Sequence, residues 1–299
     1  MQALITGGTG FIGSNLALKM LSDGHDVTIT GTDNEYKFTD ERLKILPPDF
    51  ANINWAKLGS VDVVFHQAAI NDTTIMDRNE MFRVNVEASE KLFNDAIIHG
   101  CRKIVYASST AIYGDLPAPH KEEGPFKPLN PYAESKLALD EFATEFAKQH
   151  PDVVVVGLRY CNVYGPGETK KGKRATMIYQ LAQQMKTGNP KLFKYGEQKR
   201  DYIYIKDLVQ ANILAAGAQE SCIVNCGFGE AVEFNELVNI LNDNLGASRT
   251  PEYIDNPYID KYQAHTECDM SLAKEKIGFI PKFDIKKGIA DYRNSGFLV

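Results

Sequence analysis

The sequence has no long hydrophobic run, few cysteines and no excess of positive charge. It contains no stretch of eighteen apolar residues, and residues 1–6 lead into a glycine-rich turn without a basic segment or a cleavage site. We therefore expect no membrane span and no export signal. The 33 lysines and arginines against 39 aspartates and glutamates give a formal net charge of -6, which argues against a general nucleic-acid binder. A small molecule is the expected partner.

Cysteine is scarce and scattered. The only close pair, Cys222 and Cys226, lacks the spacing and the neighbouring ligands of a zinc site, and no pair of histidines has metal-ligand spacing. We therefore expect reduced thiols in a cytoplasmic protein, and no bound metal. The five cysteines are Cys101, Cys161, Cys222, Cys226 and Cys268.

A short apolar strand, a glycine-rich turn and a helix follow one another early in the chain. Residues 3–6 are apolar, residues 7–13 read Gly-Gly-Thr-Gly-Phe-Ile-Gly, and residues 14–22 have helical periodicity. Glycines allow the backbone to approach a pyrophosphate, and a helix N-terminus offers N–H groups to its phosphates. This order therefore predicts a dinucleotide site. The residues expected to hold the cofactor are Gly7, Gly10, Phe11, Ile12 and Gly13.

The second predicted strand, residues 26–30, leads to the position that distinguishes the two nicotinamide cofactors. An acidic residue at that strand end bonds the ribose 2′-hydroxyl and repels a 2′-phosphate. Gly31 stands at the expected position and Asp33 follows two residues later, so Asp33 is the candidate ribose ligand. Lys37 or Arg42 could instead neutralise a 2′-phosphate, unless they are ordinary surface charges. We therefore expect one tightly bound NAD or NADP per subunit.

Strand-like and helix-like segments alternate along the next part of the chain. Repeated β-α units with glycines at the first turn predict a doubly wound parallel sheet with right-handed crossovers. Functional residues should then cluster at the carboxyl ends of the strands. Strands are predicted at residues 61–65, 103–107 and 153–158, and helices at residues 78–100 and 132–147.

Small residues follow the predicted strand at 61–65. The sequence there is His66-Gln67-Ala68-Ala69, which leaves room for a cofactor beside the backbone. We therefore add Gln67, Ala68 and Ala69 to the predicted cofactor site, and we expect His66 to be structural.

Tyr132 and Lys136 lie four residues apart at the start of a predicted helix and so share one helix face. A phenol has an unperturbed pKa of about 10, and a neighbouring ammonium is expected to lower that pKa toward neutrality. The pair by itself is more often a solvated helix face. Ser109, at a preceding strand end, can bond a substrate oxygen, although an isolated serine there more often caps the next segment.

The glycine turn, the serine at a strand end and the Tyr-Lys pair together resemble the signature of the short-chain dehydrogenase/reductases. Segments 108–114, 159–166 and 200–207 extend the match over essentially the whole chain. They resemble the extended branch, the NAD-dependent epimerase/dehydratase family, which acts on nucleotide-diphosphate sugars. The resemblance implies an α/β fold, with a doubly wound parallel Rossmann sheet and a smaller C-terminal α/β substrate lobe.

The same resemblance implies hydride transfer at a sugar carbon. Tyr132 would exchange the hydroxyl proton, Ser109 would orient the reacting oxygen, and Lys136 would hold the cofactor ribose and lower the pKa of Tyr132. Asn85 matches a position that supports the active-site helix beside the cofactor, and a helix-surface amide is its alternative reading. The implied partner is a nucleotide-diphosphate sugar.

Segments 71–74, 168–176 and 261–269 look like those of the ADP-glyceromanno-heptose 6-epimerases. In that group a loop lysine that matches Lys171 serves as a second acid/base facing the tyrosine. An epimerase needs two such groups, because hydride leaves one face of the sugar and returns to the other. Without the resemblance Lys171 would be a solvated charge. The residues implied at the substrate are Asn71, Thr73, Ser109, Asn162, Lys171, Arg200 and Tyr262.

Two alternative functions stay open. One is a related sugar-nucleotide enzyme, such as a UDP-sugar 4-epimerase, a dehydratase or a reductase. A dehydratase is disfavoured because Thr110 and Ala111 follow Ser109, where that group has an Asp-Glu pair. The other is a non-catalytic nucleotide sensor, although such proteins often lose the tyrosine or the lysine that this chain retains.

We expect a nucleotide-binding domain at residues 1–165 and a substrate lobe at residues 166–299, with some interleaving. Residues 34–60 are predicted to form a short crossover. Relatives of the implied family commonly assemble, so a homo-oligomer is expected. Further helices are predicted at residues 176–187, at residues 207–216 with Asp207 as the cap, and at residues 234–245.

Overall fold

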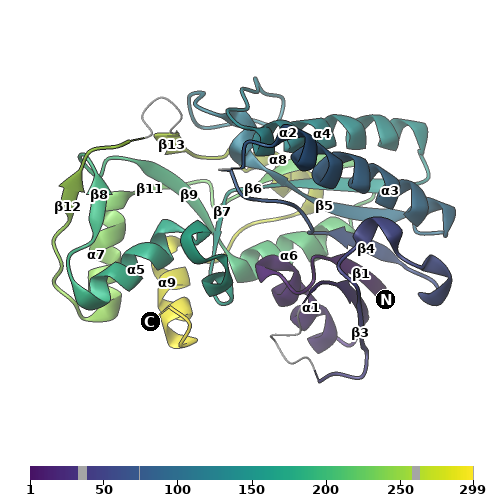
Figure 1. The fold of residues 1–299 in the computed structure, drawn as a ribbon, viewed down its shortest axis with the longest axis horizontal. Coiled ribbons are helices and arrows are strands. Elements are labelled where there is room, and N and C mark those ends of the chain that lie inside the picture. Colours follow the sequence, from purple (N-terminus) through teal and green to yellow (C-terminus); the bar gives the residue numbers. More distant parts are fainter. Residues whose placement is uncertain (33–38, 74, 258–262, 299) are drawn as a thin grey trace.

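A parallel sheet of seven strands organises the molecule (Figure 1). The computed structural model describes residues 1–32, 39–73, 75–257 and 263–298. Within them the strand order is β10-β6-β5-β4-β1-β2-β3, and every neighbouring pair is parallel. This order confirms the doubly wound α/β fold predicted from the sequence. The strands are β1 (Gln2–Thr6), β2 (Asp26–Thr30), β3 (Leu43–Leu46), β4 (Val63–His66), β5 (Lys103–Ser109), β6 (Val154–Tyr160) and β10 (Cys222–Cys226).

Helices cover both faces of this sheet and create two hydrophobic cores. α1 (Phe11–Ser22) and α6 (Ile205–Ala216) pack on one face, while α3 (Ala88–Ile98) and α4 (Pro131–Gln149) pack on the other. Successive strand residues enter opposite cores, as the wholly buried Leu4 and Ile5 do, because side chains alternate along a strand. Each such side chain stabilises the fold by about 1.5–3 kcal/mol. The sheet is therefore fixed from both sides.

The long helix predicted at residues 78–100 forms, but with an internal irregularity. α2 (Arg78–Phe82) starts after Asp77, whose side chain accepts a hydrogen bond from the Glu80 N–H. A π-helical turn, η3 (Arg83–Glu87), then leads into α3. Such turns re-aim side chains and are frequent at functional sites.

The remaining strands form a smaller lobe built around β9 (Lys199–Tyr204). β9 pairs with β7, β11 and β13, and a separate pair joins β8 to β12. None of the helices in the described ranges is long and apolar enough to cross a bilayer. The other elements of this lobe are β7 (Asn162–Tyr164), β8 (Lys191–Phe193), β11 (Ala231–Glu233), β12 (Glu252–Ile254), β13 (His265–Thr266), α5 (Met177–Thr187), α7 (Phe234–Leu245) and α9 (Ile285–Asn294). The helix α8 (Ser271–Ile277) packs against β10 and α6 of the large sheet.

β10 and α6 follow residue 166 yet belong to the large sheet and its cover, an interleaving that the sequence prediction allowed for. Two features depart from the sequence predictions. The crossover predicted at residues 34–60 contains β3, an edge strand whose Lys44 and Ile45 are exposed, so its hydrophobic pattern is weak. Asp207 does not cap α6, because the helix already begins at Ile205. Its carboxylate instead accepts the backbone N–H groups of residues 282 and 283, at 2.9 and 2.8 Å.

Candidate active site

A cleft of about 660 Å³ opens at the carboxyl ends of β1 and β4. Here the strand order reverses direction, because β1 pairs with β2 on one side and with β4 on the other. Such a switch point is where doubly wound sheets bind ligands. Most of the predicted cofactor residues line this cleft, namely Gly7, Gly10, Phe11, Ile12, Gly13, Gln67, Ala68 and Ala69, together with Asn71, Lys171 and Arg174.

The glycines of the turn are required by its geometry. Gly7 has φ +65°, and a Cβ atom there would lie 2.9 Å from the backbone of Ala68. A Cβ on Gly13 would lie 2.3 Å from the Gly7 carbonyl oxygen. In the described part of the chain no side chain caps α1, so its first N–H groups stay available to phosphate oxygens. The turn therefore suits a pyrophosphate.

Gly31 takes the place of the usual acidic residue at the end of β2 for a steric reason. A Cβ on Gly31 would lie 2.1 Å from Thr9 Oγ1, because the Thr9 side chain fills that space. Thr9 and Gly31 both line the cleft. The predicted ribose ligand Asp33 and the alternative Lys37 lie outside the described residues.

Tyr132 and Lys136 stand in the first turns of α4, which begins with Asn130 as its cap. The Asn130 side chain accepts the Ala133 N–H at 2.9 Å, and Pro131 occupies the first helical position. The Lys136 ammonium lies 5.9 Å from the Tyr132 ring centroid and donates to the Ala107 carbonyl at 2.7 Å. Since Ala107 belongs to β5, the pair is fixed to the end of that strand.

The electrostatics of this pair differ from the sequence prediction. Burial lowers the pKa of Lys136 to about 8. The pKa of Tyr132 is raised by burial, and its hydrogen bond with Ser109 offsets this only in part. The phenol pKa is therefore raised rather than lowered as the sequence predicted, because the loss of solvent outweighs the hydrogen bond with Ser109.

Ser109 ends β5 and makes two kinds of contact. Its side chain accepts the Ala111 N–H at 3.2 Å and so caps the short helix η4 (Thr110–Tyr113). The same hydroxyl is the hydrogen-bond partner of Tyr132. The interpretation of Ser109 as a helix cap is therefore confirmed, while its bonding of a substrate oxygen stays a prediction.

Asn85 connects the loop after β4 to α4. It lies within the π-helical turn and is 1% exposed, so the interpretation as a surface amide is wrong. Its amide nitrogen donates to the Ile70 carbonyl at 2.9 Å and to Ser135 Oγ at 3.1 Å, while its amide oxygen accepts the Ile70 N–H at 2.8 Å. Because Ser135 lies next to Lys136, Asn85 supports the part of α4 that carries Lys136.

Two residues behind the cleft were missed by the sequence analysis. The Tyr160 hydroxyl donates to Gln67 Oε1 at 2.9 Å and accepts from Asn212 Nδ2 at 2.9 Å. Asn212 Oδ1 also accepts from Gln67 Nε2 at 3.0 Å. Asn212 comes from α6, about 145 residues after Gln67, so only its position in the fold reveals the link.

The segment η5 (Glu168–Arg174) forms the wall opposite the glycine turn. The Lys171 ammonium lies 4.5 Å from the centroid of the Phe11 ring and 3.4 Å from the Val163 carbonyl oxygen. Burial lowers the pKa of Lys171, while the Glu168 carboxylate opposes that shift. Arg174 reaches across the cleft and donates to Asn71 Oδ1 at 2.8 Å.

Glu168 holds this segment in place and was also missed. It is fully buried, and burial raises its pKa. Its carboxylate accepts the Thr176 N–H at 2.9 Å, the Thr176 hydroxyl at 3.0 Å and the Gly165 N–H at 3.3 Å. These partners flank η5 on both sides, so one side chain closes the loop that carries Lys171. An acidic residue in a basic loop was the available sequence signal.

The other predicted substrate residues are dispersed. Asn162, on β7, donates to the Asp201 carbonyl at 2.9 Å. Arg200, on β9, donates to the carbonyls of residues 199 and 264 at 2.9 and 3.2 Å. Thr73 is exposed in the loop after β4, and Tyr262 lies outside the described residues. The structure therefore places Asn71 and Lys171 on the cleft, and Asn162 and Arg200 in the smaller lobe.

Comparison with known proteins extends this picture. Residues 3–227 match the family described as NAD dependent epimerase/dehydratase. The chain is 33% identical over 319 residues to the ADP-L-glycero-D-manno-heptose-6-epimerase of Alkalilimnicola ehrlichii, covering 97% of this chain and 95% of that protein. The crystal structure of the Helicobacter pylori ADP-L-glycero-D-manno-heptose-6-epimerase matches with a TM-score of 0.87 and 35% identity, over 98% of this chain and 95% of that one.

A second solved structure is similar at a lower sequence identity. It is the UDP-N-acetylglucosamine 4-epimerase from Methanobrevibacter ruminantium in complex with UDP-N-acetylmuramic acid. The TM-score is 0.88 and the identity 29%, over 99% of this chain and 98% of that one. The similarity thus covers both the large sheet and the smaller lobe.

Proposed function

The chain belongs to the NAD-dependent epimerase/dehydratase family, and on that basis we propose that it epimerises a nucleotide-diphosphate sugar, ADP-glyceromanno-heptose, at C6. Both heptose epimerases described above are more than 30% identical to this chain over nearly its full length. The substrate is therefore proposed from similarity, and the reaction from the arrangement of the site.

One observation carries the proposed reaction. Two groups able to exchange a proton stand on separate elements: Tyr132 on α4, bonded to Ser109 at the end of β5, and Lys171 on η5, where it lines the cleft. Epimerisation through a keto sugar requires the oxygen on the reacting carbon to lose a proton and to regain one after the sugar has turned its other face to the cofactor. Two groups on separate elements meet that need.

The cleft fits a nicotinamide dinucleotide. There is no room for a side chain at Gly7 or Gly13, and the start of α1 presents N–H groups to a diphosphate. In the proposal Gln67, Ala68, Ala69 and Asn85 border the cofactor, and Asp33 bonds the adenosine ribose. The bound cofactor supplies reversible hydride transfer. NAD and NADP both remain compatible with these residues.

The proposed roles on the sheet side follow from the contacts. Tyr132 takes the sugar hydroxyl proton, and Ser109 holds the reacting oxygen through the hydroxyl that also bonds Tyr132. Lys136 keeps its place through the Ala107 carbonyl and has further N–H groups for the cofactor ribose. Its positive charge would favour the phenolate when the substrate oxygen replaces solvent.

On the opposite wall Lys171 is the second proton-transfer group. Burial lowers its pKa, so the amine can accept as well as donate a proton closer to neutral pH. The residues proposed to bind the sugar and its diphosphate are Asn71, Thr73, Asn162, Arg200 and Tyr262. An arginine fork suits a phosphate.

The proposal also includes the domain organisation, the assembly and the location of the protein. Residues 1–165 form the nucleotide domain and residues 166–299 the substrate lobe, and the protein is a cytoplasmic homo-oligomer.

The direct test is to incubate the purified protein with ADP-D-glycero-D-manno-heptose and follow inversion at C6 by NMR. The proposal predicts formation of the L-glycero epimer without added cofactor. No inversion by folded, cofactor-loaded protein, together with turnover of a UDP-sugar in a parallel panel, would favour the 4-epimerase alternative suggested by the Methanobrevibacter ruminantium structure.

A further inference from the structure

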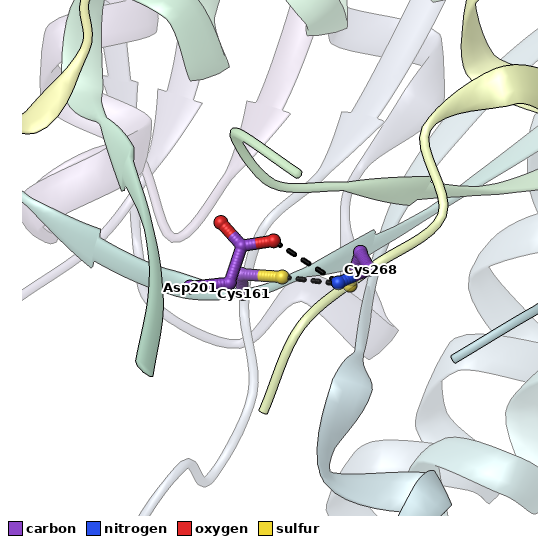
Figure 2. A group of neighbouring side chains, drawn as sticks. All are labelled: Cys161, Asp201 and Cys268. Carbon is purple, nitrogen blue, oxygen red and sulfur yellow. Dashed lines mark hydrogen bonds between the residues drawn. The ribbon is translucent and has the colours of Figure 1, made fainter. Parts of the chain in front are cut away.

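Two buried thiols face each other outside the cleft described above. Cys161 follows β6, and Cys268 follows β13 in the smaller lobe, 107 residues later. Their sulfur atoms are 2.9 Å apart (Figure 2). We propose that Cys161 and Cys268 form an oxidisable dithiol that closes to a reversible disulfide between the large sheet and the smaller lobe.

Backbone hydrogen bonds fix the positions of the two segments that carry these sulfurs. The Cys161 N–H donates to the Cys226 carbonyl at 3.0 Å, which fixes the start of the Cys161 segment. On the other side, His120 and Cys268 form a β-bridge, and the Cys268 N–H donates to Asp201 Oδ2 at 3.1 Å. A disulfide has an S–S length of about 2.05 Å, so the sulfurs need to approach by only about 0.9 Å.

Asp201 completes the group and supplies a proton acceptor (Figure 2). Its carboxylate accepts the N–H groups of Phe228 at 2.8 Å and of Gly229 at 3.1 Å, and the Cys161 thiol is a further hydrogen-bond partner. Burial raises the pKa of Asp201 to about 7. A carboxylate with this pKa can take the thiol proton of Cys161 when the sulfur reacts.

A bound metal fits this cluster less well than a disulfide does. Two thiolates on one zinc ion, each about 2.3 Å from it, lie about 3.8 Å apart in tetrahedral geometry, whereas these sulfurs are 2.9 Å apart. Backbone N–H groups also occupy the Asp201 oxygens. The group is therefore organised for sulfur-sulfur contact.

Cys268 is nearly buried but lies at the edge of a hollow. A hollow of about 430 Å³ is lined by Cys268 together with Pro119 and Met270. The hydrogen bond from Cys161 lowers the pKa of the Cys268 thiol, although burial leaves it above its ordinary value. Cys268 is therefore the sulfur expected to react first, slowly at neutral pH and faster as the pH rises, because the thiolate is the reactive form.

The reaction with a hydroperoxide balances as follows. The Cys268 thiolate attacks one peroxide oxygen and the O–O bond breaks, giving a sulfenic acid and a hydroxide, which becomes water with the proton that the Cys268 thiol released. The sulfur of Cys161 then displaces water from Cys268, its proton passing through Asp201, and the S–S bond forms. Two thiols and one hydrogen peroxide thus yield one disulfide and two waters.

Peptide mapping of the full-length protein tests the site. Native protein is treated with hydrogen peroxide at neutral and at alkaline pH, denatured in an alkylating reagent, digested and analysed by mass spectrometry. We expect a linked pair of peptides that contain Cys161 and Cys268, more of it at the higher pH, which disappears on reduction. Cys101, Cys222 and Cys226 should remain alkylated, and the oxidised protein should have a higher midpoint of thermal unfolding.

Two variants separate this pair from other pairings. Cys226→Ala removes the neighbouring buried thiol and should still form the link, whereas Cys161→Ala should not. A link between Cys161 and Cys226, a sulfinic acid at Cys268 without any link, or full alkylation of Cys161 and Cys268 would overturn the proposal. If a variant fails to fold, the peptide map of the wild-type protein still shows whether Cys161 and Cys268 are linked. No substrate is needed, so the result is independent of the proposed epimerase reaction.

Discussion

The two sides of the proposed active site are held in different ways. On the side of the large sheet, called the sheet wall below, Ser109 and Tyr132 stand on β5 and α4. Buried Lys136 ties α4 to β5, and buried Asn85 ties the π-helical turn to α4. On the opposite wall, Lys171 stands on a short 3-10 segment interrupted by Gly172 and closed by hydrogen bonds to one buried carboxylate. The sheet wall is therefore set by the fold as a whole, and the other wall by a single side chain.

This difference suits an epimerase. A cofactor and one proton-transfer group need a fixed relation, because hydride transfer depends on sub-ångström alignment. Between the oxidation and the reduction the sugar must turn its second face to the cofactor. A wall that is attached through few hydrogen bonds, such as the one that carries Lys171, can move to allow this. Substitutions can weaken each wall separately, and the expected loss of activity decreases from Tyr132→Phe to Arg174→Ala.

Tyr132→Phe should cause the largest loss. Removing the hydroxyl that exchanges the sugar proton is expected to lower turnover by about 10³-fold or more, with cofactor affinity nearly unchanged. Steady-state kinetics and calorimetric titration of the cofactor measure the two effects. Tyr195→Phe, at a residue that is 62% exposed, is the matched control and should behave as wild type. Turnover retained in Tyr132→Phe would remove this residue from the mechanism.

Lys171→Met should lower turnover by about 10²-fold, less than the tyrosine variant because the fixed wall stays intact. Lys186→Met, at an exposed position on α5, provides the comparison. If Lys171 only binds substrate, KM will rise while kcat stays near the wild-type value, and the second proton-transfer role will be excluded.

Glu168→Gln should lower kcat by about tenfold, the effect of about 1.4 kcal/mol. The Glu168 carboxylate raises the pKa of Lys171, while Arg174 and burial lower it. Neutralising Glu168 therefore lowers the pKa of Lys171, and the limb of the pH profile of kcat that reports Lys171 should move to lower pH. Glu236→Gln, on the exposed side of α7, should leave the profile in place. An unshifted profile with reduced activity would mean that Glu168 acts on loop structure alone.

Arg174→Ala should have the smallest effect. It removes a hydrogen bond to Asn71 worth about 0.5–1.5 kcal/mol, and we expect the substrate KM to rise about threefold with kcat little changed. Asn71→Ala and the double variant complete a mutant cycle. Strict additivity of the two losses would show that the contact across the cleft does not contribute in solution.

The sheet wall was largely predictable from the sequence, and the other wall was not. The glycine turn, Ser109 and the Tyr132-Lys136 pair carry local signals, since each depends on spacing within one strand, turn or helix. β3 was missed because an exposed edge strand lacks a continuous apolar pattern. The pKa of Tyr132 was predicted in the wrong direction because burial is a property of the assembled fold.

The site residues that the sequence did not reveal depend on contacts between distant segments. Asn212 and Gln67 meet only because α6 returns to the sheet, and Glu168 acquires its role only when Gly165 and Thr176 close around it. No spacing rule in the chain relates such residues. Lys171 is intermediate, because resemblance to a family pointed to it, whereas its neighbours in space became known only from the fold.

The central claim is that each wall supplies one proton-transfer group. Its most direct test is the single-turnover appearance of reduced nicotinamide absorbance when cofactor-loaded protein meets each C6 epimer separately. The account predicts complementary defects, with Tyr132→Phe slow in oxidising one epimer and Lys171→Met slow in oxidising the other. Equal slowing of both epimers in both variants would contradict it.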